Sequence, residues 1–505
     1  MNLNQIHNVY FIGIGGIGMS ALARYFQNIG KKVSGYDKTP TMLTDELIAG
    51  GMNIHFEDSI DLIPNDYYVE NTLVIITPAV PISHSEWNYF LERNYTVKKR
   101  AEVLGIITKD TFCFAVAGTH GKTTTSSILG HILYESGADV TAFLGGIVEN
   151  YHSNLIGSGK TITVVEADEF DRSFLHLHPD IACVTSMDAD HLDIYGDSSA
   201  IEDSFREFAN KVEDKSKLFV PKGLPLEGLT VAINEEATYK AFNIRVENSA
   251  YVFDVQTPSE TIQNIAFGLP GRHNLMNALT ALAMAKTNGT PTDSIVKALA
   301  SFKGVQRRFS YQIKTNDLVY IDDYAHHPTE INAVHQAVRE LYPNEKVLAV
   351  FQPHLFSRTK DFADDFAKSL SAFDEVIVFS SLCKRVNSVG TVALERPSCF
   401  FPTSANSAPS ETRSPGEQVI VHKTPSLGDA IACSIFMASR TIKTSPALTS
   451  WPGLKFTLTT FPGIGALMVP LPSTVDADFR SIDDKQTEHF DSPTLPMYRP
   501  GVDHR

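Results

Sequence analysis

Two glycine-rich loops constrain the fold of this chain more than any other feature of its sequence. The first, GIGGIG at residues 13–18, follows the apolar run VYFI and precedes ALARYFQNIG, whose apolar residues recur at helical spacing. The second, GTHGKTTT at residues 118–125, follows FCFAVA and precedes SSILGHILYESG. An apolar strand, a glycine turn and a helix form the repeating unit of parallel α/β sheets. The sequence therefore predicts an α/β protein with more than one such sheet.

The strand and helix pattern divides the 505 residues into four parts. Residues 1–105 and 106–308 each contain one of the glycine loops, and residues 309–382 contain two further strand-helix units and one strand. Residues 383–505 hold half of the chain's 26 prolines and no strand followed by a helix. Such a composition more often stays irregular than packs a core. We predict three α/β domains, the third of them incomplete, and an irregular tail.

Composition and charge exclude several classes of partner. The net charge of -15 argues against a protein that coats nucleic acid or an anionic membrane. The five cysteines form no CxxC pair, so neither a disulfide framework nor a structural zinc site is indicated. The sequence shows no basic segment ahead of an apolar core and no run of 18 uncharged apolar residues. We expect a cytoplasmic protein that needs neither nucleic acid nor a membrane, and a homodimer stays open.

The first loop fits the G-x-G-x-x-G pattern in the strand-to-helix context that this pattern requires. Glycines allow the backbone to approach a ligand closely, and the helix N-terminus attracts a pyrophosphate. Asp37 ends the next strand run about twenty residues later, where a carboxylate can bind a ribose hydroxyl. A dinucleotide and a nucleotide sugar use the same physics, and the motif alone does not separate them.

The second loop supplies what a nucleoside triphosphate needs. Lys122 can reach the phosphates, and the hydroxyl of Thr123 can bind Mg²⁺. Val116 stands where the common P-loop has its first glycine, and Gly118 takes over as the flexible residue nearer the turn. We predict that this loop binds a nucleotide.

Two later strand runs end in loops that are rich in carboxylates. Ligands of an open α/β sheet gather at the carboxyl ends of its strands. Loops after neighbouring strands can therefore place Glu166 and His191 around Mg²⁺ beside the triphosphate. The acidic residues of these loops are Glu166, Asp168, Glu169 and Asp171 in the first, and Asp188, Asp190 and Asp193 in the second.

Charged residues also follow strands in the third part of the chain. Arg358 comes after the strand run VLAVF, where its guanidinium can hold a carboxylate with two hydrogen bonds. His326 and His327 lie beside acidic residues, but adjacent side chains point apart, which argues against a shared metal ion.

Ten segments of the chain, in order, resemble the signatures of the Mur ligases, the ATP-dependent amide-forming enzymes of peptidoglycan synthesis. They extend over about residues 6–380, three quarters of the chain. The resemblance implies a function in peptidoglycan precursor synthesis, and through it in cell wall biogenesis, cell shape and cell division. The segments are GIGGIGMSALA, TPAVP, RAEVL, AGTHGKTTT, VEADEFDRSFL, DADHLDIYG, GRHNLMNAL, GVQRRF, DDYAHHPTEI and FQPHLFSRT.

The resemblance also implies three domains with different ligands. The Rossmann-like N-terminal domain holds UDP-N-acetylmuramate through Gly15, Gly16, Ile17, Gly18 and Asp37. The central P-loop ATPase domain and its neighbour bind ATP through Gly118, Thr119, His120, Gly121, Lys122, Thr123, Thr124, Asn274, Asn277 and Arg308. The implied Mg²⁺ ligands are Thr123, Glu166 and His191, and the implied catalytic residues are Lys122, Glu166, His191, Arg308 and Asp323. The incomplete Rossmann-like third domain shapes an amino-acid pocket with His327 and Arg358.

The implied reaction joins L-alanine to the carboxylate of UDP-N-acetylmuramate, with ATP and Mg²⁺ as cofactors. A carboxylate does not accept an amine directly, so ATP first converts it to an acyl phosphate, from which the amine displaces phosphate. Three alternatives stay open. A dehydrogenase built on the first loop leaves the second loop unexplained. The others are a related ligase that recycles a tripeptide onto UDP-N-acetylmuramate, and an inactive nucleotide-binding remnant.

The resemblance ends near Val378, where the family continues with further α/β units and this chain does not. We hypothesise a reading-frame change near Val378–Cys383, since one choice of codons for Lys384–Ser388, read one base earlier, encodes the Ala-Arg-Glu of the family pattern. A divergent extension is the alternative. We expect residues 383–505 to be largely disordered, the third domain to be marginally stable, and ligase activity to be weak or absent.

Overall fold

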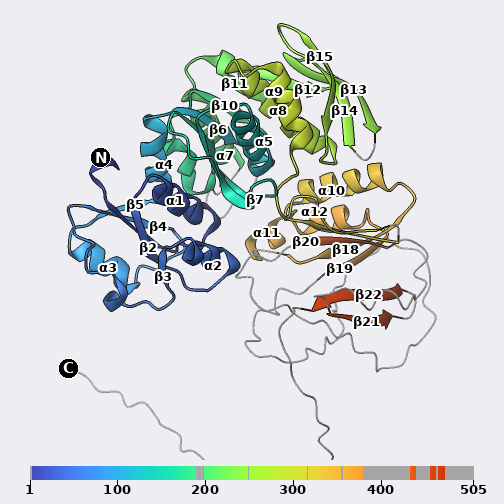
Figure 1. Cartoon of the computed structure of the whole chain (residues 1–505). Coiled ribbons are helices and arrows are strands. Elements are labelled where there is room, and N and C mark those ends of the chain that lie inside the picture. Colours follow the sequence, from blue (N-terminus) through green and yellow to red (C-terminus); the bar gives the residue numbers. More distant parts are fainter. Residues whose placement is uncertain are drawn as a thin grey trace, which may run out of the picture. The chain divides into compact units, whose positions relative to one another are not determined.

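The computed structural model describes residues 3–188, 190, 195, 198–247, 250–315, 317–353, 356–378, 433–438, 455–461 and 464–471. The chain forms two units, residues 1–443 and 444–505, and Figure 1 labels their elements. The predictions for His191, for the reading frame near Cys383 and for the order of most of the tail fall outside the described residues.

The N-terminal sheet has five parallel strands in the order β3-β2-β1-β4-β5. The order reverses at β1, so the loops after β1 and β4 lie where open α/β sheets bind ligands. Successive side chains of β1 point to opposite faces. Phe11 packs in one hydrophobic cluster with Phe26 of α1, and Tyr10 in another with Phe90 of α3, so helices cover both faces. The elements are η1 (Leu3–Gln5), β1 (Asn8–Ile12), α1 (Ile17–Asn28), β2 (Lys32–Tyr36), α2 (Met42–Ala49), β3 (Asn53–His55), η2 (Ile60–Leu62), β4 (Thr72–Ile76), α3 (Ser85–Glu92), β5 (Thr96–Lys99) and α4 (Arg100–Lys109).

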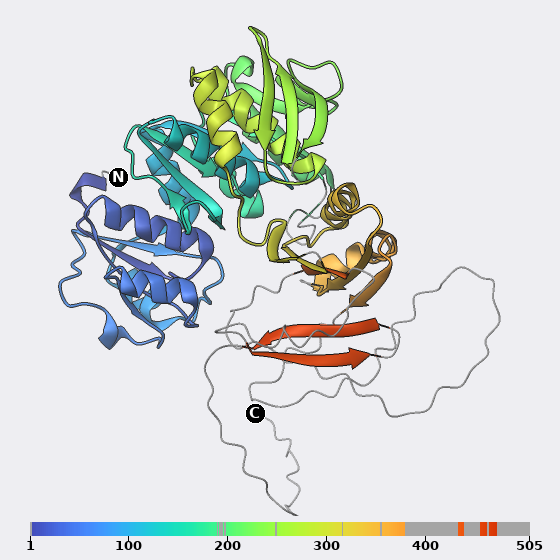
Figure 2. The ribbon, with the colours of Figure 1, turned by 45° about the vertical axis from the view of Figure 1, so that its right-hand side comes forward.

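The central sheet has ten strands in the order β15-β14-β13-β12-β11-β10-β6-β9-β7-β8. Strand β6 lies between β9 and β10, so the loop after β6 is flanked by the two acidic loops. Figure 2 shows α8 and α9 beside the strands β13 to β15. The elements are β6 (Phe112–Ala117), α5 (Lys122–Glu135), β7 (Val140–Val148), β8 (Ser153–Ile156), β9 (Ile162–Glu166), η3 (Phe170–His176), β10 (Ile181–Val184), α7 (Ser198–Asn210), η4 (Lys215–Lys217), β11 (Leu218–Pro221), β12 (Leu229–Ile233), β13 (Tyr239–Glu247), β14 (Ala250–Gln256), β15 (Thr261–Phe267), α8 (Arg272–Thr287) and α9 (Thr292–Ser301).

The third sheet has five strands in the order β16-β17-β20-β18-β19. Strands β18 and β19 are parallel, whereas β16 is antiparallel to β17. Helix α10 begins with a proline at its first position, which suits the helix geometry there, and its apolar face packs on the sheet. The elements are β16 (Ser310–Lys314), β17 (Leu318–Asp323), α10 (Pro328–Leu341), β18 (Lys346–Phe351), α11 (Phe356–Asp361), α12 (Ala363–Leu370), β19 (Glu375–Val378) and β20 (Cys433–Ala438).

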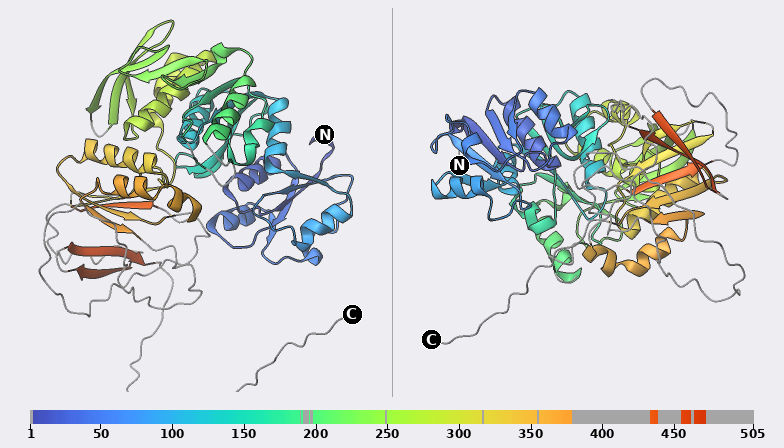
Figure 3. Two further views of the ribbon diagram at one scale, coloured as in Figure 1. Left: turned by 180° about the vertical axis from the view of Figure 1, so that it is seen from behind. Right: turned by 90° about the horizontal axis from the view of Figure 1, so that it is seen from below.

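Strand β20 lies in the tail that we predict to be largely disordered, and it adds a strand to the third sheet. It lies between β17 and β18 and pairs with both in antiparallel orientation, as Figure 3 shows. A strand followed by a helix is the sequence signal of a parallel unit, and a lone antiparallel strand such as CSIFMA carries no such signal. The third sheet therefore has more strands than we predicted.

The second unit contains one described element pair, an antiparallel hairpin of β21 (Lys455–Phe461) and β22 (Ile464–Leu471). Within the residues that the structure describes, no helix combines the length and apolar character needed to cross a membrane. The predicted parallel α/β architecture is confirmed by the N-terminal sheet and by the strands from β7 to β13 of the central sheet. In the central sheet β8, β14 and β15 are antiparallel to their neighbours.

Candidate active site

The loop between β6 and α5 depends on two glycines with positive φ. Gly118 has φ 128°, and a Cβ at this position would lie 2.7 Å from the backbone nitrogen of Thr185. Gly121 has φ 81°, and a Cβ there would lie 2.6 Å from Oδ1 of Asn277. Neither position accepts a side chain without a shift of backbone or of a buried amide. The loop therefore turns tightly onto the N-terminus of α5, a geometry that suits an anion.

Lys122, the first residue of α5, lies inside this loop. Its Nζ donates to the carbonyl oxygen of Gly118 at 2.7 Å and to the two carboxylate oxygens of Glu169 at 2.8 and 2.7 Å. Burial opposes its charge, but Glu169 and the neighbouring Asp168 and Glu166 outweigh burial and raise the pKa of Lys122. The ammonium group stays charged at neutral pH, as phosphate binding requires.

The predicted metal ligands Thr123 and Glu166 are in contact. Thr123 Oγ1 donates to Glu166 Oε1 at 2.9 Å, and the backbone nitrogen of Gly145 donates to Glu166 Oε2 at 2.8 Å. A hydroxyl and a carboxylate are hard oxygen donors, so this pair fits Mg²⁺ in its chemistry. In the described residues no group of three or more His, Cys, Asp and Glu side chains has a metal-binding arrangement, and His191 lies outside them.

The glycine loop of the N-terminal domain is held by Asp37. The backbone nitrogen of Gly15 donates to Asp37 Oδ2 at 2.7 Å, so this carboxylate shapes the loop itself. Gly16 and Ile17 begin α1, and a Cβ on Gly18 would lie 2.5 Å from a guanidinium nitrogen of Arg100. Arg100 belongs to the RAEVL segment, but we did not predict a role for it.

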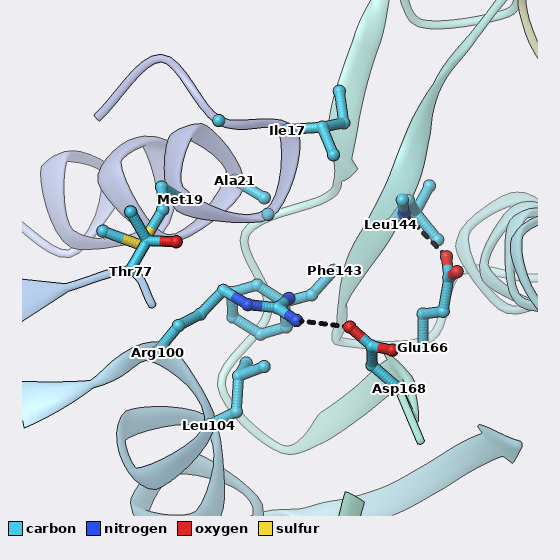
Figure 4. Close-up of a pocket in the computed structure, with 13 residues that line it drawn as sticks. Ile17, Met19, Ala21, Thr77, Arg100, Leu104, Phe143, Leu144, Glu166 and Asp168 are labelled. Carbon is cyan, nitrogen blue, oxygen red and sulfur yellow. Dashed lines mark hydrogen bonds and ion pairs between the residues drawn. The ribbon is translucent and has the colours of Figure 1, made fainter. Parts of the chain in front are cut away.

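A cavity of about 320 Å³ lies between the glycine loop of the N-terminal domain and residues of β7, β9 and the acidic loop after β9 in the ATPase domain, as Figure 4 shows. Arg100 enters it from α4 and forms an ion pair with Asp168 at 3.2 Å. Glu166 enters from the end of β9. The cavity therefore places the N-terminus of α1 and the acidic loop of the ATPase domain around one space. Its lining residues are Gly16, Ile17, Gly18, Met19, Ala21, Thr77, Arg100, Leu104, Phe143, Leu144, Gly145, Glu166 and Asp168.

His120 connects the P-loop with the third domain. Its Nδ1 lies 3.2 Å from Glu330 Oε1 of α10, its Nε2 lies 3.0 Å from Asp188 Oδ2, and its ring lies 4.8 Å from that of His327. Glu330 also lies 3.8 Å from Arg308. Neither Glu330 nor the pairing of Asp188 was predicted, because no motif that we used assigns them.

The environment of His120 predicts a charged imidazole. Burial opposes the charge, but hydrogen bonds to Asp188 and Glu330 outweigh it and raise the pKa of His120 to about 9. A raised pKa means that this stabilisation is complete below about pH 6.5 and is lost as the pH rises through about 9. The stability of the wild type relative to His120→Gln should therefore fall by up to about 3 kcal/mol over this window. Denaturant unfolding across this pH range measures it, and a constant difference would contradict the assignment.

The other residues predicted to bind ATP or to take part in catalysis are buried or contact protein groups around the P-loop and the domain junction. Asn274 Nδ2 donates to the carbonyl oxygen of Pro270 at 2.6 Å, and Asn277 lies against Gly121. Asp323 accepts from the backbone nitrogens of Phe309 and Ala325, both at 2.8 Å, and burial raises its pKa to about 6. Thr119 Oγ1 donates to the carbonyl oxygen of Asp188 at 2.9 Å, and Thr124 is buried in α5.

The predicted amino-acid pocket residues lie on the side of the third domain that faces the ATPase domain. Arg358 in α11 donates through Nε and Nη2 to the two carboxylate oxygens of Asp190, both at 2.9 Å. His327 caps α10 and accepts from the backbone nitrogen of Thr329 at 3.3 Å. The carboxylate that Arg358 holds was not predicted.

The sheet that carries the P-loop lies between two further α/β sheets, and its acidic loops lie at the carboxyl ends of its strands, next to the P-loop. This arrangement is typical of an ATP-dependent ligase. Three family models match the chain: the Mur ligase family catalytic domain over residues 8–111, the Mur ligase middle domain over 116–285, and the Mur ligase glutamate ligase domain over 307–396. The chain belongs to the Mur ligase family, which confirms the predicted resemblance.

Close relatives share one name. The chain is 81% identical over 378 residues to the UDP-N-acetylmuramate–L-alanine ligase of Flavobacterium psychrophilum and 80% identical to that of Flavobacterium johnsoniae. Each match covers 75% of this chain and 84% of the relative. The crystal structure of the UDP-N-acetylmuramate–alanine ligase of Thermotoga maritima is similar with a TM-score of 0.63 and 30% identity, covering 74% of this chain and 84% of that one. A murein peptide ligase from Psychrobacter arcticus shares the fold, with a TM-score of 0.57 and 23% identity over 74% of this chain and 84% of that one.

Proposed function

We propose that this chain is an ATP-dependent ligase that joins L-alanine to the carboxylate of UDP-N-acetylmuramate, and that the residues named above carry the reaction. The observation that carries the proposal is the cavity that the N-terminal glycine loop shares with Glu166 and Asp168 of the ATPase domain. The proposed nucleotide-sugar site at this glycine loop would then lie next to Glu166, which contacts Thr123 of the P-loop. A carboxylate on the sugar and the terminal phosphate of ATP can therefore meet.

The roles of the residues follow from their positions. Backbone groups at Gly16 to Gly18 and the Arg100 guanidinium hold the phosphates of the UDP-sugar. Lys122 and the N-terminus of α5 hold the phosphates of ATP and stabilise the charge of the transferred phosphoryl group. Asn274 and Asn277 belong to the adenine side. Arg308 reaches ATP from the domain junction, where Asp323 orders the backbone at Phe309.

The order of chemical steps follows from the reactivity of a carboxylate. The sugar carboxylate attacks the terminal phosphorus of ATP and ADP leaves, which forms an acyl phosphate. The amine of L-alanine then attacks the acyl carbon, and phosphate leaves as the amide forms. The protein contributes alignment and charge stabilisation, which are the main terms in phosphoryl transfer. His327 and Arg358 place the amino acid for the second step.

The alternative ligase that recycles a tripeptide is less well supported, because the relatives at 80 and 81% identity are named as L-alanine ligases. The decisive experiment compares L-alanine with the tripeptide in an assay of phosphate release that depends on both ATP and UDP-N-acetylmuramate. Turnover with L-alanine supports the proposal, and turnover with the tripeptide alone would contradict it. No release with either amine would instead support the inactive remnant.

We further propose that the enzyme works in the cytoplasm, where the cell holds its ATP, and a homodimer remains a prediction.

Mg²⁺ belongs to the proposal as well. Thr123 and Glu166 would hold it, with His191 as the ligand expected from the sequence. Bound there, it would neutralise negative charge on the phosphates of ATP.

Glu166→Gln removes the negative charge of the proposed metal ligand and keeps the shape of the side chain. The Mg²⁺ concentration for half-maximal phosphate release should rise at least about tenfold, and His191→Ala should act in the same direction. The exposed Glu207→Gln serves as the matched control and should leave the Mg²⁺ dependence unchanged. If Glu166→Gln and His191→Ala both titrate like the wild type, the metal assignment is wrong.

A further inference from the structure

The ion pair of Arg358 and Asp190 joins two domains and is almost fully buried. Each side chain is only 6% exposed, and the two hydrogen bonds are parallel, from Nε and Nη2 to the two carboxylate oxygens. This is the geometry in which a guanidinium recognises any carboxylate. The Asp190 side chain is a carboxylate on one methylene group, and it has nearly the size of the carboxylate end of a small amino acid.

A second observation points to a ligand at the same place. His327 is 5% exposed, and its Nε2 has no hydrogen-bond partner among the residues that the structure describes. Its Nδ1 accepts a hydrogen bond from the backbone, so the neutral ring carries its proton on Nε2. Asp190 lies close enough to favour the charged form of His327, although burial and His120 outweigh it and lower the pKa of the ring. Among the described residues this buried N–H donor lacks a partner, within electrostatic range of Asp190, and one more acceptor would satisfy it.

We propose that Asp190 is an internal substitute for the α-carboxylate of the amino-acid substrate, which must displace Asp190 from Arg358 in order to bind. The inference rests on the proposed function, in which Arg358 belongs to the amino-acid pocket. Asp190 then acts as a specificity-determining residue. An amine without a carboxylate cannot compete with Asp190 for the Arg358 guanidinium. The affinity for a substrate with a carboxylate depends on how strongly that carboxylate competes with Asp190.

This exchange also keeps the buried guanidinium paired throughout the reaction cycle. An unpaired buried charge is costly, whereas replacing one carboxylate by another keeps the two hydrogen bonds. The cost of moving Asp190 is then part of the apparent affinity for L-alanine.

The test compares L-alanine with L-alaninamide, which has the same amine and methyl group but no carboxylate. The measured quantity is the ratio of kcat/KM for L-alanine to kcat/KM for L-alaninamide, because defects in acyl phosphate formation affect both amines equally. Asp190→Asn and Asp190→Ser should raise this ratio about tenfold, since they remove the competing charge. Asp190→Glu keeps the charge and should keep the ratio nearer the wild-type value. An unchanged or lower ratio in both neutral variants would overturn the proposal.

Arg358→Gln separates this inference from the proposed function. Arg358→Gln should lower the ratio of kcat/KM for L-alanine to that for L-alaninamide about a hundredfold, because it removes the guanidinium that binds the substrate carboxylate. If Arg358→Gln weakens both amines equally, the assignment of Arg358 to the amino-acid pocket fails. If Arg358→Gln lowers the ratio while the neutral Asp190 variants leave the ratio unchanged, Arg358 keeps its place in the amino-acid pocket. Only the proposal that Asp190 stands in for the substrate carboxylate is then wrong.

A binding measurement covers variants that turn over too slowly for kinetics. Calorimetry with UDP-N-acetylmuramate and a non-hydrolysable ATP analogue present gives the affinities for L-alanine and L-alaninamide directly. The ratio of these affinities should change in the same directions as the kinetic ratio, and thermal unfolding checks that each variant is folded. Affinity for L-alanine that is the same in the wild type and in folded Asp190→Asn would refute the exchange.

Discussion

Lys122→Ala is expected to lower ATP-dependent phosphate release by at least about a thousandfold, because the ammonium group is the main positive charge inside the P-loop. The variant also leaves Glu169 buried without the cation that now pairs with both of its oxygens. Binding of UDP-N-acetylmuramate should change little, since its proposed site lies at the glycine loop of the N-terminal domain. Phosphate release and calorimetry of the UDP-sugar measure the two effects separately.

The exposed Lys160→Ala is the control for loss of a lysine in the same domain and should keep both properties. Glu169→Gln in the Lys122→Ala background removes the buried unpaired charge and should recover stability without recovering activity. Parallel loss of phosphate release and of UDP-sugar binding in folded Lys122→Ala would contradict the assignment of the two nucleotides to different domains.

Gly118→Ala is expected to destabilise the ATPase domain by about 3 kcal/mol or more and to weaken ATP binding at least about a hundredfold. The residue has φ 128°, and an added Cβ would lie 2.7 Å from the backbone nitrogen of Thr185 and 2.8 Å from that of Ser186. Since both neighbours are backbone atoms, the loop itself must move, and with it the carbonyl oxygen that holds Lys122. Denaturant unfolding and ATP titration measure the two losses.

Gly223→Ala is the matched control. Gly223 also has a positive φ, 92°, but a Cβ there meets nothing within 4 Å. This variant should lose roughly 1–2 kcal/mol from the strained backbone alone and keep its affinity for ATP. If Gly118→Ala behaves like Gly223→Ala, the close approach of the loop to Thr185 is not important for nucleotide binding.

The local parts of the site could be predicted from the sequence because each of them is a short pattern. An apolar strand followed by glycines and a helix determines the loop at Gly118 to Gly121, since few other residues adopt its backbone angles. The same reasoning placed Glu166 at the carboxyl end of a strand next to the P-loop, where the structure has it in contact with Thr123. The family resemblance extended these predictions to Arg308, Asp323, His327 and Arg358.

The contacts between domains could not be predicted in this way. Asp190 and Arg358 are 168 positions apart, and His120 and Glu330 are 210 positions apart. Periodicity and propensity describe neighbours within one element, and they do not say which charged side chains of two domains will meet. From the sequence alone, Asp190 and Arg358 each look like solvated surface residues, and only the packing of the two domains brings them into contact.

The sequence by itself thus determined the parallel strand-helix units of the first two domains, the two glycine loops and the membership in a ligase family, because these depend on residues close together along the chain. Only the tertiary structure decided which partners the charged groups have and that residues 433–438 form a strand between β17 and β18. The physical reason is the same in each case. An ion pair or an antiparallel strand pair is a contact between distant segments, and its formation depends on how the whole chain packs, which no short window of sequence contains.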